Sequence, residues 1–253
     1  MVYPAAKTVV ILDFETTGLD ENSDQVIEFG AILYSLEHRC TLQQISTLFS
    51  VERNPSIKIN RINVEPTKLI TEELCEGCIL QFRQWLKYCD YLIAHNASFD
   101  KKWLKYLAIP EIEYSKPWLC TYEDFRWPLN DKQSNLVTTA LNHGIGVSSA
   151  HRALTDCQLV AALFDRVEGF DHILNLAIKR SFAFGLVYKA IVSYDERELA
   201  KQQKFEWLSV KEIWFKIVNE LDSEDFESVC KKVGLEIEMI DVINPKNDRF
   251  IEP

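Results

Sequence analysis

The chain has 253 residues, of which 47% are hydrophobic, so it can form one large domain, or a domain with a smaller module, rather than a disordered chain. Its formal charge of −10 argues against a general polyanion binder that relies on a basic surface. A nucleic-acid enzyme remains compatible with this charge, because cations bound to a carboxylate cluster reverse the sign of the local field.

Residues 8–169 alternate between strand-like and helical patterns. Short β-branched or apolar runs predict strands at 8–14, 26–35, 43–51, 91–96 and 118–123. Apolar residues at helical spacing predict helices at 67–89, 98–109, 134–144 and 151–169. This order is typical of an α/β domain that begins with a meander of three strands, and we place the domain at residues 1–180.

The strand and helix pattern restarts after about residue 180. Strands are predicted at 184–194, 212–218 and 237–243, and helices at 195–203 and 223–235, with Asp195 and Ser223 as candidate caps. We therefore expect residues 181–253 to form a small α/β module, which is within the size range that can fold alone.

Two tryptophans of this module, Trp207 and Trp214, lie near four lysines in the sequence and could form an aromatic, basic platform for single strands. The alternative is that both tryptophans belong to the core of the module. We favour the core, because the module is net acidic. The lysines are Lys201, Lys204, Lys211 and Lys216.

Seven scattered cysteines and the absence of a long apolar run indicate a cytoplasmic chain with reduced thiols and no membrane segment. Cys75 and Cys78 form a single CxxC pattern, and a zinc site would need two more ligands. The surrounding EELCEGCILQFRQWL has the spacing of an amphipathic helix, so we interpret both cysteines as helix residues.

Asp13 and Glu15 lie at the end of the first predicted strand. Strand residues two apart point to the same face, so both carboxylates project together. Like charges this close repel unless a cation lies between them, and Mg²⁺ prefers oxygen ligands. Two ordinary solvated charges are the alternative for this pair considered alone.

Two further acids follow in positions that a fold could bring to the same place. Asp100 comes just after the fourth predicted strand, where it could also be an ordinary first-turn acid of a helix. Asp156 lies within an apolar helical face, where an unpaired carboxylate is costly and a metal would explain it. His151 precedes it by five residues, and histidine exchanges protons near neutral pH. A solvated histidine at a helix start is the alternative.

The segments DFETTG, HNASFD and HRALTDC, in this order, resemble the three exonuclease motifs of the DnaQ-like 3′–5′ exonucleases, the DEDDh family with a ribonuclease H-like fold. The resemblance covers roughly residues 7–168. It is specific, because four acids and a histidine match inside three separate motifs. Within the family, the chain looks most like bacterial exonuclease X and its relatives. The resemblance implies a mixed central sheet flanked by helices, followed here by the small C-terminal module.

The resemblance also implies roles for individual residues. Four carboxylates would hold two Mg²⁺ or Mn²⁺ ions, and His151 would be the general base, since the H-x₄-D spacing is that of the histidine subclass. The metal ligands are Asp13, Glu15, Asp100 and Asp156.

The resemblance further implies contacts near the 3′ end of the substrate. Hydroxyl and backbone groups of Thr16 and Thr17 would contact the terminal nucleotide. The side chain of Leu19 would pack against the terminal base, and Asn96 and Phe99 would line the nucleotide pocket.

One segment departs from the family. NRINV, residues 60–64, lacks the His-Gly-Ile pattern that is frequent in relatives, so the substrate contacts of this loop are not expected to follow the family.

The function implied is a metal-dependent 3′–5′ exonuclease that releases nucleoside 5′-monophosphates. Single-stranded DNA is the expected substrate, in repair or proofreading, with a polymerase or repair protein as a partner. An RNA-trimming exonuclease with the same site is the first alternative, and a non-catalytic nucleic-acid-binding or assembly module is the second. The motifs do not distinguish DNA from RNA, and the sequence indicates neither the pathway nor the oligomeric state.

Overall fold

The computed structural model describes residues 6–130 and 133–244 of the chain. The chain divides into two compact units, Met1–Ile178 and Lys179–Pro253, and the division falls inside helix α7 (Phe170–Ser181). Among the described residues, every helix is too short or too polar to span a bilayer.

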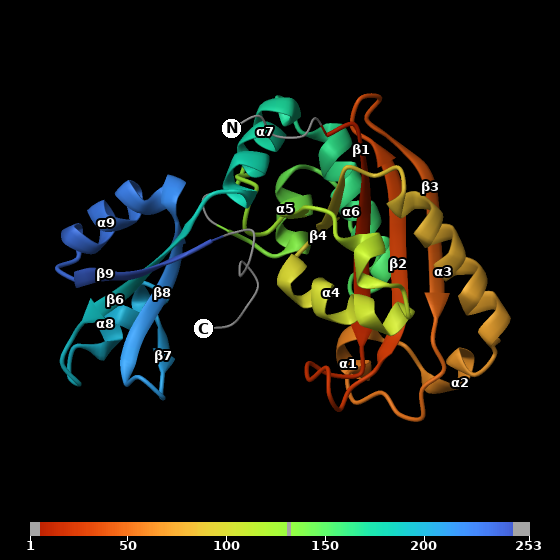
Figure 1. The fold of residues 1–253 in the computed structure, drawn as a ribbon, viewed down its shortest axis with the longest axis horizontal. Coiled ribbons are helices and arrows are strands. Elements are labelled where there is room, and N and C mark those ends of the chain that lie inside the picture. The colour runs from red at the N-terminus through yellow and green to blue at the C-terminus, as the bar shows by residue number, and fades with distance from the viewer. Residues whose placement is uncertain (1–5, 131–132, 245–253) are drawn as a thin grey trace. The chain divides into compact units, whose positions relative to one another are not determined.

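The first unit contains a mixed sheet of five strands in the order β3-β2-β1-β4-β5 (Figure 1). β1 pairs antiparallel with β2, which pairs antiparallel with β3, so the predicted meander is confirmed. β4 then pairs with β1, and β5 with β4, in parallel. The strands are β1 (Thr8–Thr16), β2 (Val26–Ser35), β3 (Cys40–Leu48), β4 (Tyr91–Ala94) and β5 (Trp118–Cys120).

The helices of this unit connect and cover the strands. In chain order they are α1 (Ile57–Asn60), α2 (Val64–Thr67), α3 (Glu72–Leu86), α4 (Ala97–Trp103), the 3-10 helices η1 (Leu104–Leu107) and η2 (Glu111–Tyr114), α5 (Leu136–Asn142) and α6 (Ala153–Arg166). The predicted α/β class is therefore confirmed.

The central strand β1 is buried on both faces, as its continuous apolar run predicts. Phe14 stacks on Phe29 of β2, which contacts Phe82 of α3 edge to face, so α3 covers the face to which Phe14 points. Because side chains alternate along a strand, Asp13 points to the opposite face. On that face Gly30 of β2 contacts the first turn of α6. The layers are thus helix, sheet, helix, with Asp13 facing α6.

Several predicted boundaries are wrong, and local backbone explains two of them. The helix predicted at 98–109 changes to the 3-10 form after Trp103 and ends at Ala108, whose φ of 51° is left-handed. The helix predicted at 151–169 begins only at Ala153, because His151 is left-handed and Arg152 is extended. Helix α7, which follows directly after Gly169, was not predicted.

The second unit has a four-stranded antiparallel sheet in the order β7-β8-β6-β9. Its core gathers Tyr188, Phe205, Val218 and Cys230 between the sheet and its helices. The predicted strands and helices are present, and the three-residue β7 was not predicted. The elements are β6 (Gly185–Ile191), α8 (Arg197–Gln202), β7 (Glu206–Leu208), β8 (Ile213–Asn219), η3 (Glu220–Asp222), α9 (Ser223–Lys232) and β9 (Glu236–Ile243).

The predicted caps of the two helices in this unit are wrong by one residue. Glu196 and Asp222 occupy the N-cap positions of α8 and α9. Ser223 instead donates its hydroxyl to the carbonyl of Glu220 at 2.8 Å, in the turn that precedes α9. Its side chain therefore stabilises the turn and not the helix start.

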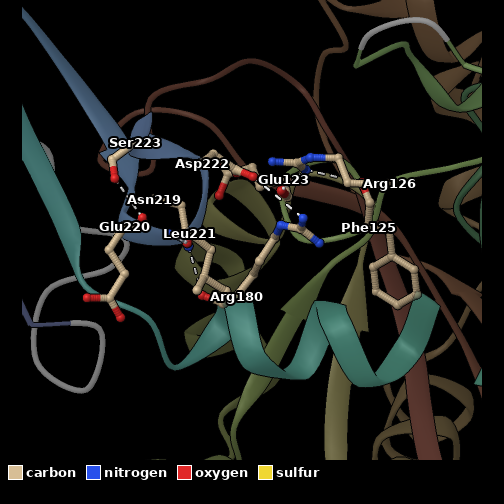
Figure 2. Close-up of polar contacts among 9 residues, drawn as sticks. All are labelled: Glu123, Phe125, Arg126, Arg180, Asn219, Glu220, Leu221, Asp222 and Ser223. Carbon is tan, nitrogen blue, oxygen red and sulfur yellow. Dashed lines mark hydrogen bonds and ion pairs between the residues drawn. The ribbon is translucent and has the colours of Figure 1, made fainter. Parts of the chain in front are cut away.

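The turn before α9 is also bound to the end of α7 within the second unit (Figure 2). Asn219 Nδ2 donates to the carbonyl oxygen of Arg180 at 2.9 Å, and its Oδ1 accepts from the backbone N–H of Leu221 at 3.1 Å. The Arg180 guanidinium lies 3.5 Å from the carboxylate of Asp222. One asparagine side chain thus connects the end of α7 with η3.

The two tryptophans of this unit have different environments. Trp214 packs against the core, as predicted, whereas the side chain of Trp207 is 50% exposed, so the core prediction is wrong for Trp207. Their rings lie 5.5 Å apart across the β7–β8 pair, because the two residues are direct cross-strand partners. Lys201 lies 6.0 Å from the Trp214 ring and also binds Glu198.

Candidate active site

The carboxyl end of β1 carries the first two predicted ligands. Asp13 and Glu15 point to the same face of the sheet, because they are two residues apart in a strand. In the antiparallel register with β2, Asp13 lies opposite Gly30 and Glu15 lies opposite Glu28. Three carboxylates therefore share one end of one sheet face.

Asp100 approaches this pair from the first turn of α4. Asn96 takes a left-handed conformation with φ of 77° just after β4, and this turns the chain into the helix. Asp100 is 1% exposed, and its Oδ1 accepts the backbone N–H of Phe14, the residue between Asp13 and Glu15, at 3.1 Å. This hydrogen bond holds the Asp100 carboxylate beside the end of β1.

Helix α6 brings the last two predicted residues to the same place. Single atoms of Glu15, His151 and Asp156 all lie within 4.8 Å of one another, a spacing at which they could share a metal ion. His151 is exposed to solvent, at the start of the helix. The structure thus brings together all four predicted acids and the histidine, which come from β1, α4, α6 and the segment just before α6.

A half-buried ion pair, which we did not predict from the sequence, lies at the edge of this cluster. Glu28 accepts two hydrogen bonds from Arg152, from Nε at 2.9 Å and from Nη2 at 2.8 Å. A third comes from the backbone N–H of Ala153 at 3.0 Å. The one sequence signal was a charged residue inside the apolar run of β2.

The carboxylates of the cluster raise one another's pKa values. Burial raises the pKa of Asp13 well above its usual range, and the charges of Asp100, Glu15 and Asp156 raise it further. Burial also raises the pKa of Asp100 well above its usual range, against the opposing effect of the Phe14 N–H. In the bare protein the carboxylates therefore resist being ionised together.

The same causes act on the two acids next to His151. Burial, with the charges of Asp156 and Glu28, raises the pKa of Glu15 to about 8, although Arg152 lowers it. Burial raises the pKa of Asp156 to about 6, against the opposing effect of His151. At neutral pH a divalent cation would relieve this repulsion by favouring the ionised forms.

The donor set fits a hard divalent metal. Asp100 Oδ2 and Asp156 Oδ1 are both buried and have no hydrogen-bond partner among the described residues. A buried carboxylate oxygen without a partner is costly, and a bound cation removes that cost. Carboxylate oxygens are also the ligands that Mg²⁺ and Mn²⁺ prefer.

Three predicted substrate residues follow Glu15 directly. Thr16 and Thr17 are buried, and the Thr17 hydroxyl accepts the backbone N–H of Gln25 at 2.9 Å. Leu19 is 84% exposed, as are several other large apolar side chains, so exposure alone assigns it no role. The Thr16 hydroxyl donates to the carbonyl of Gly18, so both threonine hydroxyls are engaged within the turn, and the contacts of all three residues to a terminal nucleotide stay a prediction.

The segment around residues 54–64, which contains the NRINV departure from the family, hydrogen-bonds to the backbone of Thr16 and Thr17. Asn60 donates its side-chain amide to the carbonyl of Thr16 at 3.2 Å, and the Ser56 hydroxyl donates to the carbonyl of Thr17 at 2.9 Å. Asn54 in turn donates to Asn60 Oδ1 at 2.8 Å. Two asparagine side chains and one serine hydroxyl of this segment therefore hold the backbone of both threonines.

The other two predicted substrate residues lie on the α4 side. Asn96 is exposed, and its Oδ1 accepts the hydroxyl of Ser98 at 3.1 Å. Phe99 is partly buried, with its ring 5.9 Å from that of Trp103. Both lie within four residues of Asp100, so they flank the carboxylate cluster, and their roles stay predictions.

Comparison with protein families gives two matches. A family model described as "Exonuclease" matches residues 10–164, a range that contains the whole carboxylate cluster and His151. A second model, described as a domain of unknown function, matches residues 186–227 in the second unit.

Comparison with individual proteins agrees with the first match. The chain is 30% identical to "DNA polymerase III PolC-type" of Thermotoga petrophila over 63% of its own length and 12% of that protein. It is 30% identical to "DNA polymerase III subunit epsilon" of Treponema pallidum over 60% of its own length and 72% of that protein. The chain thus spans only a small part of the first of these relatives.

Solved structures show the same fold. A zinc-bound complex of E. coli exonuclease I with single-stranded DNA matches with a TM-score of 0.60 at 11% identity, over 88% of this chain and 68% of that one. At this identity the likeness concerns the fold alone, and it supports the predicted ribonuclease H-like arrangement.

Proposed function

This chain belongs to the exonuclease family, and we propose that it hydrolyses nucleic-acid strands from the 3′ end with release of nucleoside 5′-monophosphates. The observation that carries the proposal is the meeting of four carboxylates and one histidine, with two buried carboxylate oxygens that have no partner among the described residues. A binding module has no need of carboxylates that repel one another.

The carboxylates are proposed to hold two divalent cations. Asp13, Glu15, Asp100 and Asp156 would supply the ligands, in agreement with their raised pKa values. When bound, such cations stabilise the charge that develops on the attacking and leaving oxygens of a phosphodiester.

His151 is the proposed general base. Its ring lies next to Glu15 and Asp156 and is exposed to solvent, so it can accept a proton from an incoming water molecule. The water oxygen forms a bond to phosphorus as the bond from phosphorus to the 3′ oxygen breaks. The 3′ oxygen takes up a proton and becomes the new 3′ hydroxyl of the shortened strand, while the nucleoside 5′-monophosphate leaves.

Single-stranded DNA is the proposed substrate. The two polymerase III relatives and the exonuclease I complex are named for DNA, which supports this choice over RNA. The same names support a partner in DNA replication or repair. Leu19, which is exposed beside the two buried threonines, is proposed to contact the terminal base.

The test is a time course on 5′-labelled DNA and RNA strands of one sequence, with Mg²⁺ or Mn²⁺. A ladder that shortens from the 3′ end on DNA would support the proposal, and a ladder on RNA alone would change the substrate to RNA. Strands that stay intact with both metals would refute catalysis. A 3′-phosphorylated DNA strand is the control for direction, since a blocked 3′ end should slow the first cleavage.

A further inference from the structure

We propose that Glu28 is a positioning residue that holds His151 in place through Arg152 and the backbone N–H of Ala153. This inference rests on the proposed role of His151 as general base. It assigns to Glu28, on β2, a function in the reaction, although its own carboxylate is fully engaged in hydrogen bonds with α6.

Both oxygens of Glu28 are used to fix the two residues that follow His151. Oε1 accepts from Arg152 Nη2 at 2.8 Å, and Oε2 accepts from Arg152 Nε at 2.9 Å and from the Ala153 N–H at 3.0 Å. The paired, parallel bonds between a guanidinium and a carboxylate fix direction as well as distance. The start of α6 is therefore bound to the beginning of the buried strand β2.

The backbone at this point needs such support. His151 has a φ of 58°, in the left-handed region that most side chains avoid, and Arg152 is extended with φ of −136° and ψ of 120°. A disfavoured conformation of this kind persists when the surrounding contacts over-determine it. Here the contacts on residues 152 and 153 supply that constraint, and they leave the imidazole next to Glu15 and Asp156.

Stability alone explains the pair poorly. Glu28 is 2% exposed and lies directly opposite Glu15 in the strand register, where two like charges repel. An apolar residue would fill this position in an apolar strand at lower cost, since an ion pair with a half-exposed arginine contributes little net stability. A role in holding residues 151–153 in one conformation explains the carboxylate of Glu28 better than a contribution to stability does.

The experiment is a double-mutant cycle in single-turnover assays on DNA, using Glu28→Gln, His151→Asn and the double variant. Asparagine is chosen at position 151 because it tolerates the left-handed conformation and its amide takes no proton. We expect Glu28→Gln to slow the wild-type reaction by about 10- to 100-fold, the range seen for outer partners of reactive groups. In the His151→Asn background, Glu28→Gln should lower the rate by less than about twofold, because the base that Glu28 positions has been removed.

Hydrogen exchange gives a readout that does not need activity. We expect Glu28→Gln, and also Arg152→Lys, to speed exchange of the backbone N–H groups at residues 151–153. Arg152→Lys is the second variant because the Arg152 side chain is 42% exposed, so this change is compatible with folding. Lysine keeps the charge and loses the paired bonds.

Glu113→Gln is the matched control. Glu113 forms the same kind of paired contact with Arg83, at 2.8 Å and 2.6 Å, on η2 and α3, which carry none of the proposed site residues. Glu113→Gln should change neither the single-turnover rate on DNA nor the hydrogen exchange of residues 151–153.

Two results would overturn the inference. The first is an equal loss of rate from Glu28→Gln in both backgrounds, which would mean that Glu28 acts through the carboxylates or the fold. The second is unchanged exchange at residues 151–153 in both variants. A wild-type protein without nuclease activity would refute the proposed function instead, and the exchange measurement would still decide whether Glu28 holds the segment.

Discussion

Asp13 and Gly30 lie directly opposite each other in the antiparallel register of β1 and β2. A Cβ on Gly30 would come within 2.4 Å of the backbone nitrogen of Leu154, so no other residue fits between β2 and α6 as they stand. The missing side chain at position 30 therefore sets how closely α6 approaches the face on which Asp13 projects. The distance between Asp13 and Asp156 depends on this contact.

Substitution of Gly30 by alanine should consequently damage both stability and activity. The obstacle is backbone, which cannot move aside as a flexible side chain could, so we expect a loss of about 1–3 kcal/mol in the free energy of unfolding. A shift of α6 by about 1 Å should also slow nucleotide release by about a hundredfold. Denaturant unfolding and a strand-shortening assay measure the two effects.

Gly77→Ala is the control for that substitution. Gly77 lies within α3, and a Cβ there meets nothing within 4 Å. The change should raise the free energy of unfolding by up to about 1 kcal/mol, since alanine favours helix over glycine. If Gly30→Ala behaved like Gly77→Ala, the close approach of α6 would not matter.

The second prediction concerns pH in the absence of divalent metal. In the folded protein the pKa of Glu15 is about 8, whereas an unfolded glutamate has a pKa of about 4.3. Between these values the folded state binds more protons than the unfolded state, so stability falls as pH rises. We expect the melting temperature in EDTA to decrease from about pH 5 to about pH 8.

Two additions should reverse or weaken that decrease. Mg²⁺ or Mn²⁺ at the proposed site would stabilise the folded protein, and we expect either ion to raise the melting temperature most at the higher pH. Glu15→Gln removes one of the titrating carboxylates and should make the pH dependence in EDTA shallower, while Asp13, Asp100 and Asp156 keep part of it. A melting temperature that rose with pH in EDTA, with no response to either metal, would contradict the proposed metal site.

The third prediction concerns Leu19. Because its side chain is 84% exposed, Leu19→Ala should leave the free energy of unfolding within about 0.5 kcal/mol of wild type. If Leu19 contacts the terminal base, the substitution should raise KM for a DNA strand several-fold. Leu69→Ala is the control, since Leu69 is 77% exposed and lies outside the carboxylate cluster. Equal KM values for both variants would remove Leu19 from the substrate site.

The fourth prediction separates the two tryptophans of the second unit. Trp214→Ala removes a side chain that packs against the core and should cost about 3 kcal/mol in stability. Trp207→Ala removes a half-exposed ring and should cost clearly less. If Trp207→Ala instead weakened DNA binding with little loss of stability, the aromatic platform considered for this module would be supported at that residue. Fluorescence-monitored unfolding and a DNA-binding titration make the comparison.

Local patterns in the sequence were sufficient to predict much of the site. The alternation of strand side chains places Asp13 and Glu15 on one face, and the cost of a carboxylate in an apolar helix singles out Asp156. The buried position of β1 follows from the continuous apolar run at residues 8–14, and the meander follows from three predicted strands in succession. These features depend on residues that are close together in the chain.

Features that depend on distant residues could not be predicted in this way. The pair of Glu28 and Arg152 joins positions 124 residues apart and exists only because Gly30 lets α6 approach β2. β7 has three residues, too few to show a periodicity, and α7 begins directly after Gly169, where we predicted the preceding helix to end. In each case tertiary packing, and not local preference, determines the structure.

The most direct test of the account compares wild-type protein with Asp156→Asn, which keeps the size of the side chain and removes the charge of a proposed metal ligand. The measurement is release of nucleoside 5′-monophosphate from single-stranded DNA with Mg²⁺, with a cooperative melting transition of each protein as evidence of folding. We predict release from the 3′ end by the wild type and a rate at least about a hundredfold lower for the variant. Release at the same rate by both proteins, or no release by the wild type, would contradict the proposal that this carboxylate cluster is a catalytic metal site.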